Sequence, residues 1–310
     1  MIAGTPWWAW TGVLAAIVLM LVIDLLAHRR AHVVSIREAL GWSSIWLSLG
    51  LGFGVVIWLS QGGTAGGEYF AAYLVEKSLA VDNVFVFALL FGYFAVPPQY
   101  QHRVLFYGVL GALVMRAGFI AAGAVLLERF HWVIYVFGAL LLLTGIKMAR
   151  HREFEVHPDR NPLVRLTRRL MPMTTEYHGQ RFWIRQAGRW VATPLLVVLV
   201  AVETTDLVFA VDSIPAVFAV TSDPFLVFTS NAFAILGLRA LYFLLAGAMH
   251  RFTYLRYGLA AILVFVGTKM LLTDLYKIPI WISLSVIIAL IGGAIAASWW
   301  RRAPTTTPEH

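Results

Sequence analysis

The sequence has no cysteine among its 310 residues, and only 13% of them are charged. Without cysteine the chain can form no disulfide, perform no thiol redox chemistry and offer no thiolate to a metal. All nine histidines fall in predicted loops or at predicted helix ends. Imidazole is therefore missing from the membrane interior, and no methionine lies in the predicted helices 69–96 and 191–220, which argues against sites for zinc, copper or nickel there.

Hydrophobic residues make up 60% of the chain, a composition typical of a polytopic membrane protein. The net charge of +8 does not indicate nucleic-acid binding, because the basic residues lie between apolar runs and form no basic face with stacking aromatics. Runs of about 20 apolar residues can cross a bilayer. They predict an all-α membrane helix bundle, a single domain over 1–310 with about nine transmembrane helices. The predicted helices are 7–27, 39–60, 69–96, 103–127, 131–149, 191–220, 225–249, 255–273 and 279–300.

Basic residues between the predicted helices are distributed very unevenly over the two membrane faces, with eighteen on one side and two on the other. The first group comprises Arg29, Arg30, Arg37, Arg103, the ten Lys and Arg from Lys147 to Arg189, Arg251, Arg256, Arg301 and Arg302, and the second comprises Arg129 and Lys277. Since cytoplasmic loops carry the excess of basic residues, we expect an inner-membrane protein with its N-terminus outside and its C-terminus in the cytoplasm. The basic loop 150–190 would then be cytoplasmic, with an amphipathic surface helix around Leu163–Leu170.

Two predicted helices carry acidic residues in similar patterns. Residues 76–83 read Glu-Lys-Ser-Leu-Ala-Val-Asp-Asn, and residues 203–213 read Glu-Thr-Thr-Asp-Leu-Val-Phe-Ala-Val-Asp-Ser. Aligning Asp82 with Asp212 places Glu76 on Asp206. A carboxylate at the bilayer centre costs at least about 2.5 kcal/mol, so it is retained only when it is paired or functional.

The acidic helices belong to two longer segments that resemble each other, about 69–149 and about 191–273. Arg116 matches Arg239 in the second helix of each segment, and the third helices end in similar Gly-x-Lys-Met sequences. In the predicted topology the two segments cross the membrane in opposite directions. They are therefore predicted to be inverted three-helix repeats, with a substrate site near the midplane where the repeats meet.

The donor atoms of the acidic helices predict the type of ligand. Carboxylate, amide and hydroxyl oxygens suit a hard divalent cation such as Mg²⁺, Ca²⁺ or Mn²⁺. Paired carboxylates could also exchange the metal for protons. The predicted metal ligands are Glu76, Asp82, Asn83, Glu203, Asp206, Asp212 and Ser213.

The helical spacing does not bring all of these oxygens to one face. Residues seven apart share a face, as Asp206 and Ser213 do, whereas residues six apart differ by about 120°. We therefore expect either local unwinding near Pro215 or contributions from both helices across their interface. Lys77 is interpreted as a charge partner of the acids, and Asp24 as an interfacial residue that reaches water.

These residues resemble signatures of the TerC family of integral membrane proteins, and within it the Alx-like branch. The resemblance covers roughly 7–300 and includes the two acidic stretches together with the segment from Asn231 to Arg239. It implies divalent-metal transport, chiefly manganese export, with the acidic residues as ligands and Mn²⁺ as substrate rather than cofactor. The family name comes from tellurium resistance, and Alx-like members were described as redox modulators, a description that a chain without cysteine hardly supports.

Several interpretations stay open at this point. The acids could pair with Arg116, Arg239 and Lys77 and only hold the bundle together. The transported ion could be calcium or a tellurium oxyanion, although an anion would require converging basic side chains. The protein could also be a scaffold or assembly factor without transport activity, and a homo-oligomer is a further possibility. An enzyme is the least favoured interpretation, because no histidine-based zinc motif and no nucleophile–base pair is evident.

Overall fold

A computed structural model describes residues 5–27, 34–150, 161–186, 188–245, 254–276 and 278–300 of the chain. Eleven helices and one two-stranded sheet lie within these residues. The helices are α1 (Trp7–Ala27), α2 (Ile36–Gln61), α3 (Gly63–Tyr93), α4 (Pro98–Arg129), α5 (Val133–Arg150), α6 (Pro162–Leu170), α7 (Pro194–Phe218), α8 (Pro224–Leu236), α9 (Leu238–Leu245), α10 (Leu255–Leu271) and α11 (Ile280–Trp300). The predicted helical bundle is thus confirmed as a mostly helical fold.

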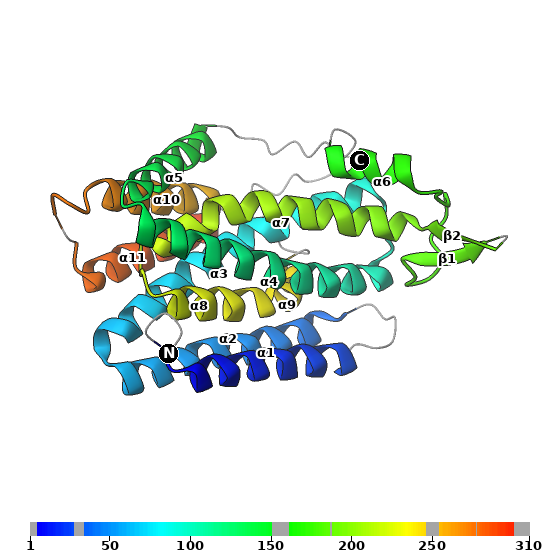
Figure 1. Cartoon of the computed structure of the whole chain (residues 1–310). Coiled ribbons are helices and arrows are strands. Elements are labelled where there is room, and N and C mark those ends of the chain that lie inside the picture. Colours follow the sequence, from blue (N-terminus) through cyan, green and yellow to red (C-terminus); the bar gives the residue numbers. More distant parts are fainter. Residues whose placement is uncertain are drawn as a thin grey trace, which may run out of the picture.

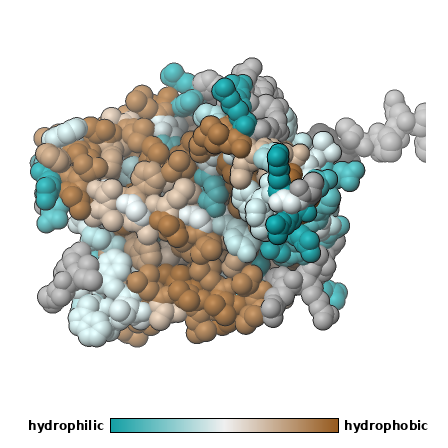
Figure 2. Space-filling model, turned by 45° about the vertical axis from the view of Figure 1, so that its right-hand side comes forward, coloured by the Kyte–Doolittle hydropathy of each residue, from teal (hydrophilic) through white to brown (hydrophobic). Residues whose placement is uncertain are grey.

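The long helices lie side by side along one common direction, with α6 and the β-hairpin at one end of the bundle (Figure 1). A space-filling view shows a broad hydrophobic region across the middle of the molecule, with hydrophilic residues gathered toward its two ends (Figure 2). Many large apolar side chains of α1, α2 and α11 are exposed, as expected for helices that face lipid. The surface is therefore that of an integral membrane protein.

Six helices of the described chain are long and apolar enough to cross a membrane, or seven if α8 and α9 count as one bent span. The six are α1, α2, α4, α5, α7 and α11. The remaining predicted spans correspond to α3, whose charged residues interrupt its apolar sequence, and to α10, which has only 17 residues. By length and composition alone, the nine predicted spans are therefore not all established.

Helix α3 occupies the centre of the bundle and packs against α2, α7, α8 and α11. Tyr69, Tyr73 and Val75 on this helix are fully buried. A central helix has little contact with lipid, so it can carry polar residues if its neighbours supply partners. This position explains how one helix accommodates several charges.

A single residue, Gly62, connects α2 to α3, whereas the predicted helices 39–60 and 69–96 leave residues 61–68 as a loop between them. The structure places residues 63–68 in the first turns of α3. Gly62 has a φ of +92°, a backbone conformation that residues with a Cβ rarely adopt. The predicted loop is therefore wrong, because glycine allows the chain to reverse within one residue.

The predicted helix 225–249 is interrupted at Gly237. Helix α8 begins after Asp223, whose side chain accepts a hydrogen bond from the backbone N–H of Phe225 at 2.8 Å. The axes of α8 and α9 differ by 41° across Gly237. A Cβ on residue 237 would lie 3.0 Å from Trp46 Cβ, so the absence of a side chain allows α2 to approach the bend. The last residues of the predicted helix, 246–249, lie outside the described residues.

Helices α5 and α10 meet through glycines in close backbone contact. A Cβ on Gly138 would lie 3.0 Å from the carbonyl oxygen of Gly267, and one on Gly145 would lie 2.9 Å from that of Ala260. The residue numbers rise along one helix as they fall along the other, so the two helices are antiparallel.

The basic loop 150–190 contains the predicted surface helix and one element that the sequence did not reveal. Helix α6 begins after Asn161, which accepts hydrogen bonds from two backbone N–H groups of the first turn. Strands β1 (Trp183–Gln186) and β2 (Arg189–Ala192) form an antiparallel hairpin. The all-α prediction is corrected in this detail: four-residue strands in a basic loop give no clear alternating pattern. Residues 151–160 of the loop lie outside the described residues.

Candidate functional site

Arg116, in the middle of α4, is the centre of a buried polar cluster. Its Nη1 donates to Glu76 Oε2 at 2.8 Å and to Ser213 Oγ at 3.0 Å. Its Nη2 and Nε donate to the two carboxylate oxygens of Asp206, at 3.2 and 3.4 Å. Glu76, Arg116 and Asp206 are each at most 2% exposed. One guanidinium therefore joins α3, α4 and α7 through charge-assisted hydrogen bonds.

Asn231 of α8 provides the second partner of Glu76. Its Nδ2 donates to Glu76 Oε1 at 2.8 Å, so both oxygens of this carboxylate accept hydrogen bonds. Asn231 is 2% exposed. The predicted ligand set omitted this residue. An amide within a mostly apolar helix was the available signal, because a buried polar group requires a partner.

The cluster combines two carboxylates with one guanidinium. With all three groups ionised, Glu76 and Asp206 contribute two negative charges and Arg116 one positive charge. Charges buried in this way are stable only when they are paired and hydrogen-bonded. The guanidinium thus lies between the two carboxylates, and the oxygens that surround it are hard donors of the kind that divalent cations prefer.

Glu203 lies one turn before Asp206 on α7 and faces α4 at Gly111. A Cβ on residue 111 would collide with the Glu203 carboxylate, so this close approach requires glycine. The Oε2 atom of Glu203 is buried and has no hydrogen-bond partner in the described part of the chain. A buried carboxylate oxygen without a partner is rare and can accept a proton, a water molecule or a cation.

Asp82 and Asp212 have different neighbours from the Arg116 cluster. Asp212 Oδ1 accepts a hydrogen bond from Thr144 of α5 at 3.0 Å and interacts electrostatically with Lys147. Asp82 is partly buried on α3 and interacts electrostatically with Arg256 of α10. Asn83 is 3% exposed on the same helix.

The structure brings some of the predicted ligands together and leaves others apart. Glu76, Asp206 and Ser213 share Arg116, whereas Asp82, Asn83, Glu203 and Asp212 are not hydrogen-bonded to this group. In the ranges that the structure describes, no three Asp, Glu, His or Cys side chains lie close enough together to hold a metal ion. The role of these residues as metal ligands therefore stays a prediction.

Helix α7 shows no unwinding, which corrects one of the two geometric expectations. It runs continuously from Pro194 to Phe218 with Pro215 in its last turn. Asp206 and Ser213 share a face of this regular helix, as their spacing predicts, and both contact Arg116. The oxygens converge because Glu76 approaches from α3 across the interface.

Two charged residues have partners that differ from the expected ones. Asp24 does not reach water: it is 6% exposed and forms a buried ion pair with Arg239, which is 5% exposed. The interruption at Gly237 places Arg239 in α9, where it faces α1. The Lys77 ammonium donates to the backbone oxygen of Ala234 at 3.1 Å, in the last turn of α8, rather than to an acidic side chain. A cation at this position is favoured by the negative end of the helix dipole.

Comparison with known proteins identifies relatives along almost the whole chain. A family model described as "Integral membrane protein TerC family" matches residues 61–306. An uncharacterised membrane protein of Myxococcus xanthus is 52% identical over 303 residues, covering 97% of this chain and 95% of the relative. A protein of Escherichia coli (strain K12) named "Putative membrane-bound redox modulator Alx" is 48% identical over 307 residues, covering 96% of this chain and 95% of the relative. A protein with the same name from Salmonella typhi is 51% identical over 307 residues, covering 96% of this chain and 95% of the relative. No solved structure matches the chain significantly.

Proposed function

Because the chain belongs to the TerC family of integral membrane proteins, we propose that it is a secondary transporter that exports manganese, a hard divalent cation, from the cytoplasm. The proposed membrane is the bacterial inner membrane. Mn²⁺ is the substrate in this proposal, so the protein needs no resident cofactor and catalyses no chemical reaction.

The observation that carries the proposal is the cluster of Glu76, Arg116 and Asp206. Two buried carboxylates from separate, similar helices meet at one guanidinium. If the acids served only to hold the helices together, one carboxylate for the arginine would suffice, and the second adds a desolvation cost. Two carboxylates that share one guanidinium are suited to exchange it for a transported cation.

We infer that an entering metal ion displaces the Arg116 guanidinium from the carboxylates. The ion would then meet oxygens of Glu76, Asp206 and Ser213, with water completing its coordination. Glu203 has an unpartnered oxygen one helical turn away and is proposed to receive the ion before or after this position. Asp82, Asn83 and Asp212 are proposed to line the remainder of the pathway.

The proposal includes nine transmembrane spans and two inverted repeats, 69–149 and 191–273. Their equivalent third helices, α5 and α10, are antiparallel, as a two-fold axis in the membrane plane requires. Gly145 and Gly267 are equivalent in the two repeats, and each closely approaches the backbone of the other helix. These contacts support the symmetry, and the site near Arg116 lies at the interface of α3 and α7, the first helices of the repeats.

The proposed orientation places α6 and the β-hairpin in the cytoplasm. This end of the bundle carries Arg165, Arg185 and Arg189 among the described residues (Figure 1). Cytoplasmic ends of membrane proteins are enriched in such residues. Eight further basic residues that entered the prediction lie outside the described residues: Arg29, Arg30, Arg152, Arg160, Arg251, Lys277, Arg301 and Arg302.

A second candidate function is suggested by the redox-modulator name that the relatives carry. The present chain has no cysteine, so it could not act through thiol–disulfide exchange. A calcium transporter or a non-transporting scaffold would be compatible with the same family membership. The acid-rich interior argues against a tellurium oxyanion, because an anion would be repelled by the carboxylates.

Manganese flux into vesicles that contain the purified full chain tests the proposal. We expect wild-type protein to move Mn²⁺ and Glu76→Gln to reduce the rate at least about tenfold, because one charged ligand is lost. Arg165→Gln, on exposed α6, is the control and should transport normally. Absence of flux, or equal flux in the wild type and Glu76→Gln, would contradict the proposed site. Parallel measurements with Ca²⁺ separate the two cations.

A further inference from the structure

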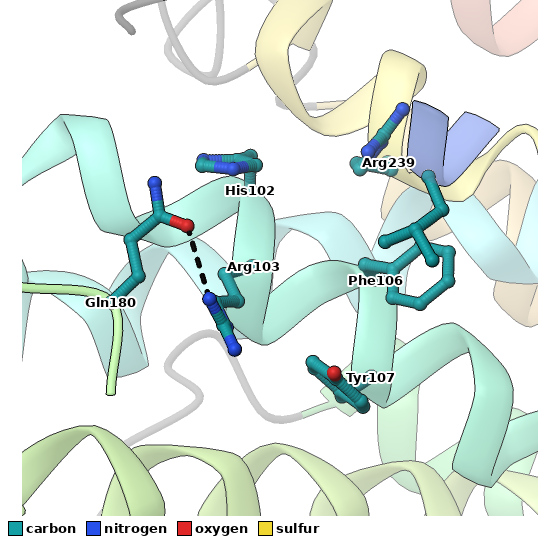
Figure 3. A pocket seen from close by; sticks show the side chains of 7 residues that line it. His102, Arg103, Phe106, Tyr107, Gln180 and Arg239 are labelled. Carbon is teal, nitrogen blue, oxygen red and sulfur yellow. Dashed lines mark hydrogen bonds between the residues drawn. The ribbon is translucent and has the colours of Figure 1, made fainter. Parts of the chain in front are cut away.

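A cavity of about 190 Å³ opens at the end of the bundle that carries the β-hairpin. It lies between α1, α4, α9 and the segment that precedes β1, and its lining is shown in Figure 3. The lining residues are Leu25, His102, Arg103, Phe106, Tyr107, Gln180 and Arg239. The lining is therefore partly apolar and partly basic, and none of these described lining residues carries a carboxylate.

Arg103 supplies positive charge to the lining of this cavity. Its Nη1 donates to Gln180 Oε1 at 3.3 Å, and its guanidinium lies over the rings of Tyr107 and Phe182, at 5.9 and 5.6 Å from their centroids. Its Nε–H is buried and has no hydrogen-bond partner among the residues that the structure describes. The side chain is thus held in place by neutral groups, and one of its donors is unsatisfied.

The second arginine of the cavity is already neutralised. Arg239 forms its ion pair with Asp24, so it contributes little net charge. Arg103 has no carboxylate partner within the described ranges, in contrast to Arg116, which has two. Arg103 is partly buried, and its Nε atom is inaccessible to solvent. A partly buried guanidinium without a counter-charge is destabilising, and a bound anion would offset part of that cost.

The position of the cavity indicates where the anion comes from. Leu25 lies in the last turn of α1, a candidate membrane span, and is 44% exposed. Tyr107 is 36% exposed and presents an aromatic rim. The cavity therefore lies where a span reaches the membrane–water boundary, with apolar surface for acyl chains beside a basic interior. Basic pockets between transmembrane helices at this level suit phospholipid head groups.

We propose that this cavity binds the phosphate group of an acidic phospholipid, with Arg103 as the main ligand and Gln180 holding it in position. The lipid would connect α1, α4 and α9 to the segment before the hairpin. This site is separate from the Arg116 cluster, and its existence does not depend on which ion the protein transports.

Native mass spectrometry of the purified, delipidated full chain tests this site. Phosphatidylglycerol and phosphatidylcholine are added separately, and inorganic phosphate is added in a third experiment. We expect wild-type protein to retain phosphatidylglycerol in preference to phosphatidylcholine, and Arg103→Gln to weaken this binding at least about tenfold through the loss of charge-assisted hydrogen bonds. Millimolar inorganic phosphate should not displace the lipid, because it lacks the apolar contacts.

A second variant keeps the test decisive if Arg103→Gln does not fold. Gln180→Glu places a carboxylate next to the guanidinium at nearly unchanged volume, so it should also weaken lipid binding while Arg103 stays in place. Arg185→Gln removes an exposed arginine of β1 and should leave binding unchanged. The proposal is overturned if Gln180→Glu binds phosphatidylglycerol like the wild type, or if Arg185→Gln reduces binding equally. Displacement by inorganic phosphate would identify a site for soluble phosphate instead.

Discussion

Glu76 and Asp206 accept hydrogen bonds from the same guanidinium, although they belong to different helices, α3 and α7. They are also the residues that align when the two acidic stretches are superposed in the sequence. Their meeting point is Arg116 of α4, so neither carboxylate can lose its partner without affecting the other. Loss of Arg116 would therefore leave two buried carboxylates without a counter-charge, whereas loss of the cation of a simple ion pair would leave one.

Replacing Arg116 by Gln should destabilise the protein and make its stability depend on metal. Two buried carboxylates would remain without a counter-charge, which costs about 3–5 kcal/mol for a broken buried pair. A divalent cation that binds them should restore part of this loss, since ligands that bind only the folded state stabilise it. Thermal unfolding in detergent, with and without Mn²⁺, measures both effects. A variant that is destabilised but gains no more from Mn²⁺ than the wild type would argue for a purely structural cluster.

Asp82→Asn and Asp212→Asn each remove a charge at nearly constant shape. The cost of placing an anion in the membrane falls, so a scaffold should tolerate either change or gain stability. A metal exporter should lose transport, because affinity for hard cations depends on the charge and number of the ligands. Cells with normal amounts of either variant should therefore accumulate manganese, as elemental analysis can show, and grow poorly in excess manganese. Wild-type export by both variants would remove these residues from the pathway.

Gly111→Ala should disturb Glu203 specifically. The new Cβ would occupy the position of the Glu203 carboxylate, and such overpacking typically costs about 1–3 kcal/mol. Gly118→Ala, on the same helix, is the matched control, because nothing lies within 4 Å of its added Cβ. Combining Gly111→Ala with Glu203→Asp, which shortens the side chain, should recover stability in thermal unfolding. Equal effects of the two alanine substitutions would contradict the close contact.

The proposed orientation can be checked by labelling single cysteines, since no native cysteine competes. Gln61→Cys is at the exposed end of α2, and Arg165→Cys is on the exposed face of α6 at the opposite end of the bundle. An impermeant thiol reagent added to intact cells should label position 61 and spare position 165. The reverse pattern would invert the topology and change the direction of transport.

The sequence identified the charged residues of the site better than their partners. Glu76, Asp206 and Arg116 stand out because charges are rare in apolar helices. Their burial was predictable because a charged side chain in a membrane helix rarely faces lipid. Asn231 and Thr144 are neutral, and their contacts depend on how α8 and α5 rotate against α3 and α7, which no single helix specifies. The ion pair of Asp24 and Arg239 was also missed. It depends on how α1 packs against α9, and α1 lies outside the repeated segments, so the repeat gave no indication of it.

The sequence also predicted the long helices more accurately than their ends and interruptions. Apolar length determines a membrane helix, and the predicted boundaries differ from the observed ones by a few residues in most cases. The turn at Gly62 and the bend at Gly237 could not be predicted in this way, because glycines are common throughout the apolar sequence. Only the packing of the neighbouring helices shows which glycine allows a turn or a bend.

The ratio of two carboxylates to one guanidinium also has an electrical consequence. With Arg116 as its only cation, the ionised site carries one negative charge, and a bound divalent metal would change this charge to one positive. Against a membrane that is negative inside, outward movement of the loaded site and inward return of the empty site each cost about 2.3 kcal/mol per 100 mV. If Glu76 and Asp206 each return with a proton, the site has the same charge in both directions. The exchange of one metal ion for two protons would then be insensitive to the membrane voltage.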